Sequence, residues 1–305
     1  MWSAVALWLH ACSQAEPPLR VGTNVWPGYE PLYLAREIGK LPDDQVQLVE
    51  LSSAADVIRL FRSGSLDVAA MTLDQVLTQL RMPEPVSIIL VTDISMGADA
   101  IVAAADVPSM AALHGRRIGV EPGSVGEFLL VRALSLNAMR AADVQRVGLS
   151  ASELEPALRD GRVDAVAVFE PERGRLLASG ARVVFDSARI PGEILDVLVV
   201  RSARVGARAA ALQTLTRGWF SALRALSESP QQAAAVMARR ENVDAVSLYA
   251  VLDLLHFPGR DENAAALSGH SPGLAMAIDR VSRYAEPDAV ALAQAVRLDA
   301  RFVAD

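Results

Sequence analysis

The first two thirds of the chain alternate between short apolar runs of strand character and amphipathic segments with helical spacing. Strands are predicted at residues 19–23, 46–51, 68–71 and 86–93, where alternating or β-branched apolar residues are bounded by turn residues. Helices are predicted between them, from Pro31 onward, from Ser53 to Gly64 and from Leu73 to Arg81. Strands that alternate with helices in this way predict parallel sheets.

The same order of elements follows further along the chain. A strand at 117–120, a helix from Val125, a strand at 145–149, a helix ending at Arg159 and a buried strand at 165–169 are predicted. After residue 207 the apolar spacing is helical, which predicts helices at 207–226, 230–240, 244–255, 272–284 and 287–302. We expect these helices to pack on the first α/β unit.

A constant offset of 97 positions relates the two series of elements. The recurring pairs are Arg20/Arg117, Gly22/Gly119, Glu30/Glu127, Leu32/Leu129, Ser53/Ser150, Ala54/Ala151, Arg62/Arg159, Gly64/Gly161, Asp67/Asp164 and Ala70/Ala167. The chain therefore contains two copies of one β-α-β-α-β unit. Two such units predict two α/β lobes whose strand ends face each other across a cleft.

The chain is expected to cross between the lobes twice. The turn-rich segment 95–99 is the predicted first crossing, and the return is predicted at the strand Val197–Arg201. These positions divide the chain into a leader and tether at 1–18, lobe 1 at 19–98 plus 201–305, and lobe 2 at 99–200. The hinge would lie at the two crossings.

Charge and composition exclude some functions. The 305 residues carry a net charge of −7, and no cluster of basic residues extends beyond short pairs such as Arg239-Arg240. Because a nucleic-acid surface needs a basic stripe to neutralise phosphates, we expect no nucleic-acid partner. The single cysteine, Cys12, permits no disulfide within the chain.

Residues 1–12 have the character of an export signal. The apolar stretch 2–9 is shorter than the roughly 20 residues that span a bilayer, but it has the length of a signal core. Leu9–Cys12 resembles a bacterial lipobox, although His10 is unusual there and no basic residue precedes the apolar run. We expect lipidation at Cys12, the alternative being an ordinary thiol near a chain end.

Capping signals mark several helix starts. The patterns that begin at Ser53, Thr72, Ser124 and Ser150 each place an acid or glutamine three residues later, which satisfies free amides at a helix N-terminus. Ligands of parallel α/β lobes bind at the carboxyl ends of strands, beside such N-termini. Ser52, Ser53, Thr72 and Ser124 are therefore candidate ligand donors as well as caps.

Acidic residues gather at the predicted strand ends and the crossing, namely Asp74, Asp99, Glu121, Glu170 and Asp196. The offset pairs Leu73 with Glu170, so residues 72–74 should face Phe169 and Glu170 across the cleft. Taken singly, each acid is explained equally well as a solvated or capping group. Together they favour a ligand with a cationic or N–H-rich part, on which Trp26 and Tyr29 could stack. Trp26 could instead be a lid residue of the core.

Catalytic motifs are lacking in the sequence. It contains no HExxH element, paired metal-binding cysteines, Gly-x-Ser-x-Gly element or Gly-Lys-Ser/Thr phosphate loop, and residues 121–127 resemble a glycine-rich loop that lacks its lysine. We therefore expect no catalytic residue, no metal and no cofactor.

Several segments together resemble the nitrate/sulfonate/taurine-type solute-binding proteins of bacterial ABC importers, a group that includes thiamine-pyrimidine binders. The segments are 20–74, 97–99, 113–120, 167–171 and 191–201. The resemblance implies a periplasmic-binding-protein fold, a monomer in the periplasm or on the outer face of a membrane, and docking on the membrane subunits of a transporter. Any membrane contact would be made through the lipid anchor. It also implies that Trp26, Ser52, Ser53, Thr72, Leu73, Gly97, Ser124, Val125, Glu170 and Asp196 line the site. The cysteine cluster and active histidine of related pyrimidine synthases have no counterpart here.

The expected ligand is a small organic solute that carries nitrogen or sulfur. A nitrate or simple sulfonate receptor should place a cation in the cleft, whereas the arginines here fall at strand starts or on helix faces. An aminosulfonate such as taurine, or an aminopyrimidine, satisfies both the helix ends and the acids. The alternatives are a lyase or dehydratase that uses a cleft carboxylate, and the sensory domain of a regulator.

Overall fold

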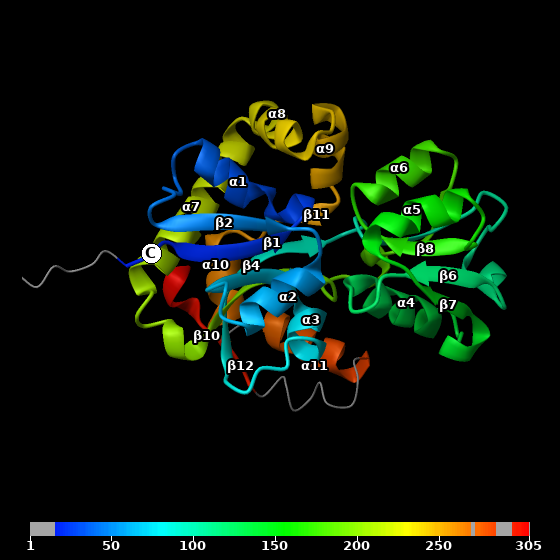
Figure 1. Ribbon diagram of the computed structural model, residues 1–305, viewed down its shortest axis with the longest axis horizontal. Coiled ribbons are helices and arrows are strands. Elements are labelled where there is room, and N and C mark those ends of the chain that lie inside the picture. Colours follow the sequence, from blue (N-terminus) through cyan, green and yellow to red (C-terminus); the bar gives the residue numbers. More distant parts are fainter. Residues whose placement is uncertain (1–15, 270–271, 285–294, 305) are drawn as a thin grey trace, which may run out of the picture.

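Two mixed β-sheets, each covered by helices, form the centres of two lobes that lie side by side (Figure 1). This computed structural model describes residues 16–269, 272–284 and 295–304. In the described parts of the chain, no helix combines the length and the apolar character needed to cross a bilayer. The segment that contains Cys12 lies outside the described residues.

The sheet of lobe 1 has the strand order β11-β4-β10-β3-β1-β2, with β12 also paired to β4. Strand β1 is parallel to β2 and β3, whereas β10 runs antiparallel between β3 and β4. Almost every residue of β3, β4 and β10 is buried, as expected for strands covered on both faces. The strands are β1 (Leu19–Asn24), β2 (Val46–Leu51), β3 (Val68–Thr72), β4 (Val86–Ser95), β10 (Leu195–Arg201), β11 (Leu255–His256) and β12 (Val296–Leu298).

Helices cover both faces of this sheet. Helices α1 and α7 pack together on one face, and α2, α3 and α11 cover the other (Figure 1). Helices α8 and α9 lie at the edge of lobe 1 that faces lobe 2, and α10 packs against β4. The helices are α1 (Glu30–Glu37), α2 (Ala54–Arg62), α3 (Leu73–Thr78), α7 (Ala209–Glu228), α8 (Pro230–Glu241), α9 (Ala245–Leu252), α10 (Arg260–Leu267) and α11 (Pro272–Tyr284).

Lobe 2 repeats this plan with fewer elements. Its sheet has the order β7-β6-β8-β5-β9, in which β5 is the antiparallel strand. Helices α5 and α6 cover one face and α4 the other (Figure 1). The elements are β5 (Ala100–Ala103), β6 (Arg117–Val120), α4 (Val125–Leu136), β7 (Gln145–Gly148), α5 (Ala151–Arg159), β8 (Ala165–Val168), α6 (Glu172–Ala178) and β9 (Arg182–Asp186).

Short 3-10 turns connect several of these elements. They are η1 (Pro27–Tyr29), η2 (Met110–Leu113), η3 (Ala141–Asp143), η4 (Ser187–Arg189), η5 (Ser202–Arg204) and η6 (Ala300–Phe302). Of these, η1 leads directly into α1, and η4 begins the return from lobe 2 to lobe 1.

The sequence repeat corresponds to the same hydrogen-bonded contact in each lobe, between the residue that precedes the third strand of the repeat and the first strand. The carboxylate of Asp67 accepts from the backbone N–H of Arg20 at 2.9 Å, and Asp164 accepts from that of Arg117 at the same distance. Gly64 and Gly161 end the preceding helices with φ angles of +81° and +68°, a region that favours glycine. The agreeing positions of the two copies are therefore scaffold.

The chain crosses between the lobes at residues 96–99 and again at residues 187–194. The two crossings are bonded to each other, because the hydroxyls of Ser95 and Ser187 lie 2.7 Å apart and Gly97 N–H donates to Ser187 Oγ at 2.7 Å. Both serines are fully buried.

The return crossing corrects the predicted domain boundary. Strand β10 was assigned to lobe 2, but it pairs along its length with β3 and β4 of lobe 1. The apolar run 195–200 predicts a buried strand without specifying which sheet accepts it. In the structure it fills the place between β3 and β4, so the return lies before residue 195.

The C-terminal prediction also needs correction. Of the helix expected at 287–302, residues 285–294 lie outside the described residues, and residues 296–298 form strand β12 parallel to β4. Helix α10 and strand β9 were not predicted. The helix expected at 244–255 ends at Leu252 because the chain turns into β11, which pairs with β4.

The bonded crossings give a stability prediction. Replacing Ser187 by Ala leaves the Gly97 N–H and the Ser95 hydroxyl buried without this partner, so the free energy of unfolding should fall by about 1–3 kcal/mol. Urea denaturation of Ser187→Ala measures the loss. Ser135→Ala, on the exposed face of α4, is the matched control, and an equal effect in both variants would contradict the assignment.

Candidate functional site

A cavity of about 250 Å³ lies between the two lobes, where the carboxyl ends of their parallel strands face each other. Residues from lobe 1, lobe 2 and the first crossing contribute to it. They are Asn24, Val25, Trp26, Tyr29, Ser52, Ser53, Ala54, Thr72, Gln75, Asp99, Glu121, Ser124, Val125, Ala151, Ser152, Phe169, Glu172 and Asp196.

Two aromatic side chains meet across the cavity. Trp26 follows β1 of lobe 1 and Phe169 follows β8 of lobe 2; their ring centroids are 5.7 Å apart, edge to face at 84°. The indole N–H of Trp26 donates to Asp93 Oδ1 at 3.2 Å, which fixes the ring. The two lobes therefore contact each other through an aromatic pair beside the cavity.

Helix N-termini form much of the remaining wall. Ser53 caps α2 by accepting from the N–H of Asp56 at 3.2 Å, and Ser124 caps α4 by accepting from Gly126 at 3.1 Å. Gln75 Oε1 accepts from the N–H of Thr72 at 3.2 Å, whereas Thr72 Oγ1 is buried with no hydrogen-bond partner among the described residues. Ser53, Ser124 and Gln75 therefore act as helix caps, as predicted. The hydroxyl of Thr72 lies at the cavity without a partner among the described residues.

Carboxyl groups form the floor. Asp93 on β4 and Asp196 on β10 are neighbours in the sheet register, and the hydroxyl of Tyr29 donates to Asp196 Oδ1. Asp99 is 3% exposed, and its Oδ2 has no hydrogen-bond partner in the described parts of the chain. The cavity therefore presents an unsatisfied buried carboxylate oxygen, which is costly without a ligand.

Burial makes these acids weak. It raises the pKa of Asp93 and of Asp99 to about 7 each, and that of Asp74 to about 6. Burial, and then the charge of Asp93, raise the pKa of Asp196 well above its ordinary value. The pKa of Glu121 is also raised, by partial burial and by the nearby Glu172. The site therefore holds several protons near neutral pH.

The repeat continues into the cavity wall as matched pairs at the same offset of 97. Asn24 pairs with Glu121, Ala54 with Ala151, Thr72 with Phe169 and Gln75 with Glu172, and both members of each pair line the cavity. In two pairs, lobe 1 supplies an amide where lobe 2 supplies a carboxylate. The cavity is symmetric in its backbone but not in its charge.

Most of the residues predicted from the sequence line this cavity. They are Trp26, Tyr29, Ser52, Ser53, Thr72, Asp99, Glu121, Ser124, Val125, Phe169 and Asp196. Leu73 and Asp74 do not, because they begin α3 and turn inward, with exposed fractions of 0% and 5%. Gly97 lies in the bonded crossing, where its N–H is used by Ser187.

Glu170 also lies outside the cavity. Its carboxylate accepts from Arg173 at 2.8 Å and from the N–H of Gly174 at 3.1 Å, so it faces the start of α6 rather than the ligand space. It borders a second cavity of about 500 Å³ between α6 and the α8–α9 connection. We predicted that residues 72–74 face residues 169 and 170 across the cleft. Of these residues, only Thr72 and Phe169 line the cavity.

The structure adds lining residues that the sequence did not suggest: Asn24, Val25, Ala54, Gln75, Ala151, Ser152 and Glu172. The offset of 97 contained part of this signal. Applied to Glu121, it indicates Asn24; applied to the Gln75 of the capping pattern, it indicates Glu172.

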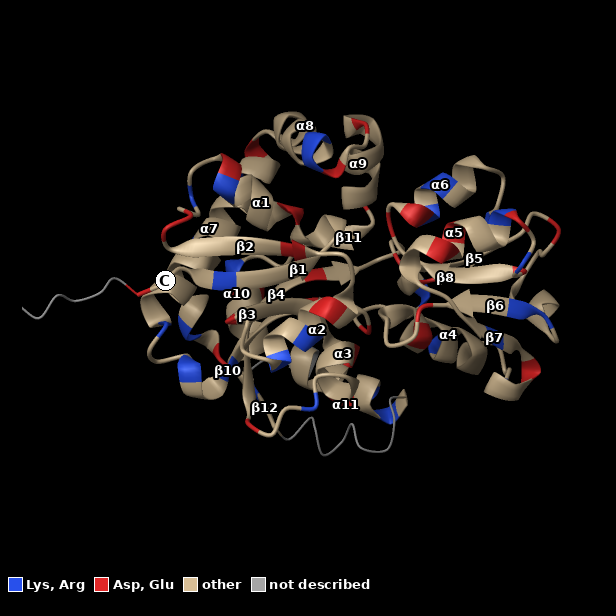
Figure 2. Ribbon diagram, in the orientation of Figure 1, with Lys and Arg blue, Asp and Glu red and all other residues tan. Residues whose placement is uncertain are grey.

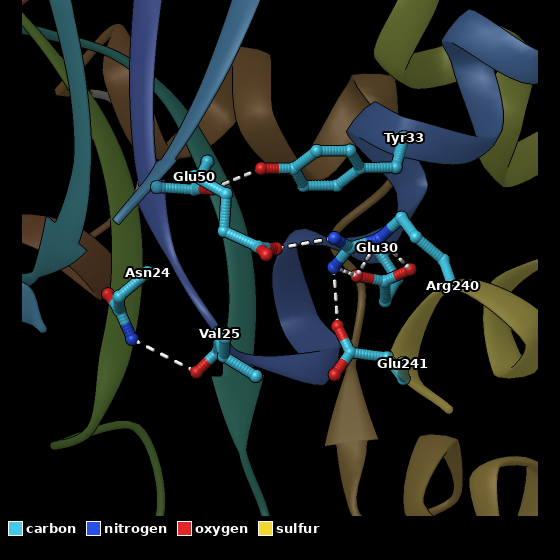
Figure 3. Close-up of polar contacts among 8 residues, drawn as sticks. Asn24, Val25, Glu30, Tyr33, Glu50, Arg240 and Glu241 are labelled. Atoms are coloured by element: carbon cyan, nitrogen blue, oxygen red, sulfur yellow. Dashed lines mark hydrogen bonds and ion pairs between the residues drawn. The ribbon is translucent and has the colours of Figure 1, made fainter. Parts of the chain in front are cut away.

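A partly buried ion cluster lies next to the lobe 1 wall of the cavity (Figure 3). Arg240 of α8 donates from Nε to both oxygens of Glu30 at 2.9 and 3.0 Å and also bonds Glu50 and Glu241. Its guanidinium carbon lies 3.7 Å from the centroid of the Tyr33 ring. The cluster joins α8 to the start of α1 and to the end of β2, which directly follow and precede the wall segments 24–29 and 52–54 respectively.

Glu30 is the costly member of this cluster. It is fully buried, and burial raises its pKa to about 8 despite the opposing attraction of Arg240. The C-terminal helices, which have no counterpart in lobe 2, therefore stabilise the cavity through one arginine.

Among the described residues, no group of three or more His, Cys, Asp or Glu side chains is placed to hold a metal ion. Acidic positions lie on both sides of the interlobe gap, at the starts of α2, α5 and α6 (Figure 2). The lining residues include no lysine, arginine or histidine. The site is suited to binding through hydrogen bonds, aromatic faces and carboxylates.

Two α/β lobes joined by two crossings, with a cavity between them, define the periplasmic-binding-protein fold, which other solved structures share. The chain belongs to the NMT1-like family, whose model matches residues 13–240. A protein from Escherichia coli (strain K12) that is named as an aliphatic sulfonates-binding protein is 26% identical to this chain over 160 residues. These residues are 48% of this chain and 47% of that protein. The match thus spans about half the length of that relative.

Solved structures extend the likeness to the whole fold. The alkanesulfonate-binding protein SsuA from Xanthomonas axonopodis pv. citri, bound to MOPS, superposes with a TM-score of 0.72 at 18% identity, over 93% of this chain and 99% of the other. The desulfurization enzyme DSZB has a TM-score of 0.58 at 18% identity, over 92% and 99% of the two chains. The fold therefore accommodates both binding proteins and an enzyme.

Asp99 gives a prediction about pH and stability. The folded protein holds a proton on Asp99 up to about pH 7, whereas the unfolded chain loses it near pH 4, so this group's contribution is favourable at low pH and is lost as the pH rises through 7. Asp99→Asn should therefore be more stable than the parent protein at pH 8 by on the order of 2 kcal/mol. The difference should shrink toward pH 5.

Thermal unfolding between pH 5 and pH 8 measures this effect. Asp160→Asn removes an exposed carboxylate of lobe 2 and should leave the pH profile unchanged. A loss of stability at pH 8 in Asp99→Asn would show that its ionised form is favoured in the fold.

The Arg240 cluster gives a second prediction. Arg240→Met leaves the buried Glu30 without its partner and should lower the free energy of unfolding by about 3 kcal/mol. Adding Glu30→Gln removes the unpaired acid and should recover part of that loss in urea denaturation. Arg239→Met, at the neighbouring exposed position, is the control, and an equal loss there would contradict a specific function for Arg240.

Proposed function

We propose that this protein is the extracytoplasmic solute-binding component of an ABC importer, which captures a small nitrogen- or sulfur-containing organic solute between its lobes. The observation that carries the proposal is the cavity formed between the two lobes, whose chain passes from one to the other at two crossings that are hydrogen-bonded to each other. Such an arrangement allows the lobes to open and close on a ligand by rotation about the crossings.

The family and the relatives support this function. The E. coli relative and SsuA from Xanthomonas are named as sulfonate-binding proteins, and they share sequence or fold with this chain. By extension we propose a periplasmic location or one on the outer face of a membrane, the membrane subunits of a transporter as partners, and a monomeric state. Lipidation of Cys12 would supply the anchor in the second case.

The lining residues favour a ligand with two kinds of polar group. The hydroxyls of Ser53 and Ser124 already donate to Asp56 and Glu121, so it is the backbone N–H groups at the starts of α2 and α4 that favour an acceptor such as a sulfonate or a ring nitrogen. The carboxylates accept from amino groups. Trp26 and Phe169 provide apolar faces. Taurine-like aminosulfonates and aminopyrimidine-like compounds fit this description.

An enzyme on the same fold is the second candidate, because carboxylates with pKa values near 7 are suited to proton transfer and DSZB shares the architecture. Native mass spectrometry of the protein purified from its host separates the two functions. A solute recovered unchanged after denaturation supports transport. Turnover without a transporter, lost in Asp99→Asn, supports the enzyme.

The aromatic pair predicts a binding defect. Calorimetric titration with taurine, alkanesulfonates, nitrate and an aminomethylpyrimidine identifies a ligand, and Trp26→Ala or Phe169→Ala should then weaken its binding about 10- to 100-fold, because each variant removes one wall of the cavity. Tyr249→Ala, on an exposed part of α9 outside the cavity, should bind normally. Equal binding by all variants would place the ligand elsewhere.

A further inference from the structure

We propose that the cavity selects a cationic ligand: a small organic molecule whose protonated nitrogen binds Asp99 and the carboxylates of lobe 2, while its neutral polar end faces the amides of lobe 1. Simple anions such as alkanesulfonates would be rejected. The inference rests on the proposed function and specifies its ligand class.

The charge of the lining is the first observation. Asp99, Glu121, Glu172 and Asp196 line the cavity, and no basic side chain does. The arginines near the site do not line the cavity: Arg173 bonds Glu170 through Nη1 and keeps a buried Nε without a partner among the described residues, and Arg175 bonds Glu155 and Glu172. An anion would therefore find no counter-charge in the lining, and as the pH rises past the pKa of about 7 of Asp99, the ionised carboxylates would repel it in this low-dielectric space.

The unsatisfied Asp99 is the second observation. Its Oδ2 is buried at the cavity without a hydrogen-bond partner among the described residues, although the Asp99 backbone is fully used by the crossings. A buried polar atom without a partner is costly, so a native arrangement that keeps one at a ligand cavity points to a ligand donor. A protonated amine or amidine supplies donors and charge together.

The asymmetry of the repeat is the third observation. Asn24 and Gln75 of lobe 1 occupy the positions that Glu121 and Glu172 occupy in lobe 2. The amides can both donate and accept, whereas ionised carboxylates only accept. The difference orients a ligand across the cleft, with its positive end toward lobe 2.

Among the described residues, the titratable groups that interact with Asp99 are carboxyl groups and one phenol. Asp93 and Asp196 lie on β4 and β10, Asp74 on α3, Tyr29 at the end of η1 and Glu170, which is bonded to Arg173, in the loop after β8. A bound cation favours the ionised form of Asp99 and its neighbours, so binding releases protons. Cation affinity should therefore rise with pH, whereas anion affinity should fall as the carboxyls ionise.

Three probes of nearly equal size test the charge alone: benzamidinium, benzamide and benzoate. Each keeps one charge state between pH 6 and pH 8. Isothermal titration should give the affinity order benzamidinium, benzamide, benzoate. Affinity for benzamidinium should increase about tenfold from pH 6 to pH 8, since a carboxyl with a pKa of about 7 gains that much ionised fraction. Benzoate binding as tight as benzamidinium binding, a reversed pH trend, or no difference among the probes would overturn the proposal.

Two variants locate the effect. Asp99→Asn should weaken benzamidinium binding about 30-fold or more, while its stability at pH 8 is at least that of the parent protein. Glu172→Gln installs the residue that the equivalent position of lobe 1 already carries, so it should fold normally and lose affinity about tenfold. Glu37→Gln, at an exposed position of α1 outside the cavity, should leave the affinity unchanged. A uniform response of the three variants would contradict the site.

The outcomes separate this inference from the function itself. A co-purified sulfonate that carries no protonated nitrogen, recovered unchanged, would leave the solute-binding function intact and refute the charge selection. Turnover of any bound compound would instead refute the solute-binding function, whatever the charge of that compound.

Discussion

The two hydrogen-bonded crossings between the lobes are the constraint on which the rest of the structure depends. Ser95 and Ser187 join the crossings to each other, and Gly97 is tied to the same hydroxyl. Because β10 then returns between β3 and β4, the floor of the cavity is built by strands that belong to both halves of the chain.

The carboxyl groups on that floor oppose stability. Asp93, Asp99 and Asp196 are almost fully buried, and their raised pKa values mean that ionisation is disfavoured in the unliganded protein. Tyr29 and Trp26 satisfy two of them, and Asp99 keeps a free oxygen. Functional sites are where proteins keep such unfavourable groups, because a ligand provides the missing interaction.

The two lobes differ in size because lobe 1 contains helices α7–α11, which have no counterpart in lobe 2. One of these helices, α8, supplies Arg240, which bonds the buried Glu30 and also Glu50. These two acids lie behind the wall that carries Trp26 and Ser53. These additional helices stabilise the lobe 1 wall of the cavity. A ligand would therefore bind between one lobe with this additional support and one smaller lobe without it.

The sequence by itself determined the strands and helices of both repeats, the offset that relates them, and most of the residues at the strand ends. Local spacing and capping patterns are sufficient for this, since Gly64 and Gly161 end their helices by a local preference for positive φ, and Ser53 caps α2 within the same segment. Only the tertiary structure decided which sheet accepts β10, that Glu170 turns to Arg173, and that Glu172 lines the cavity instead. These outcomes depend on contacts between distant segments, for which a local pattern contains no information.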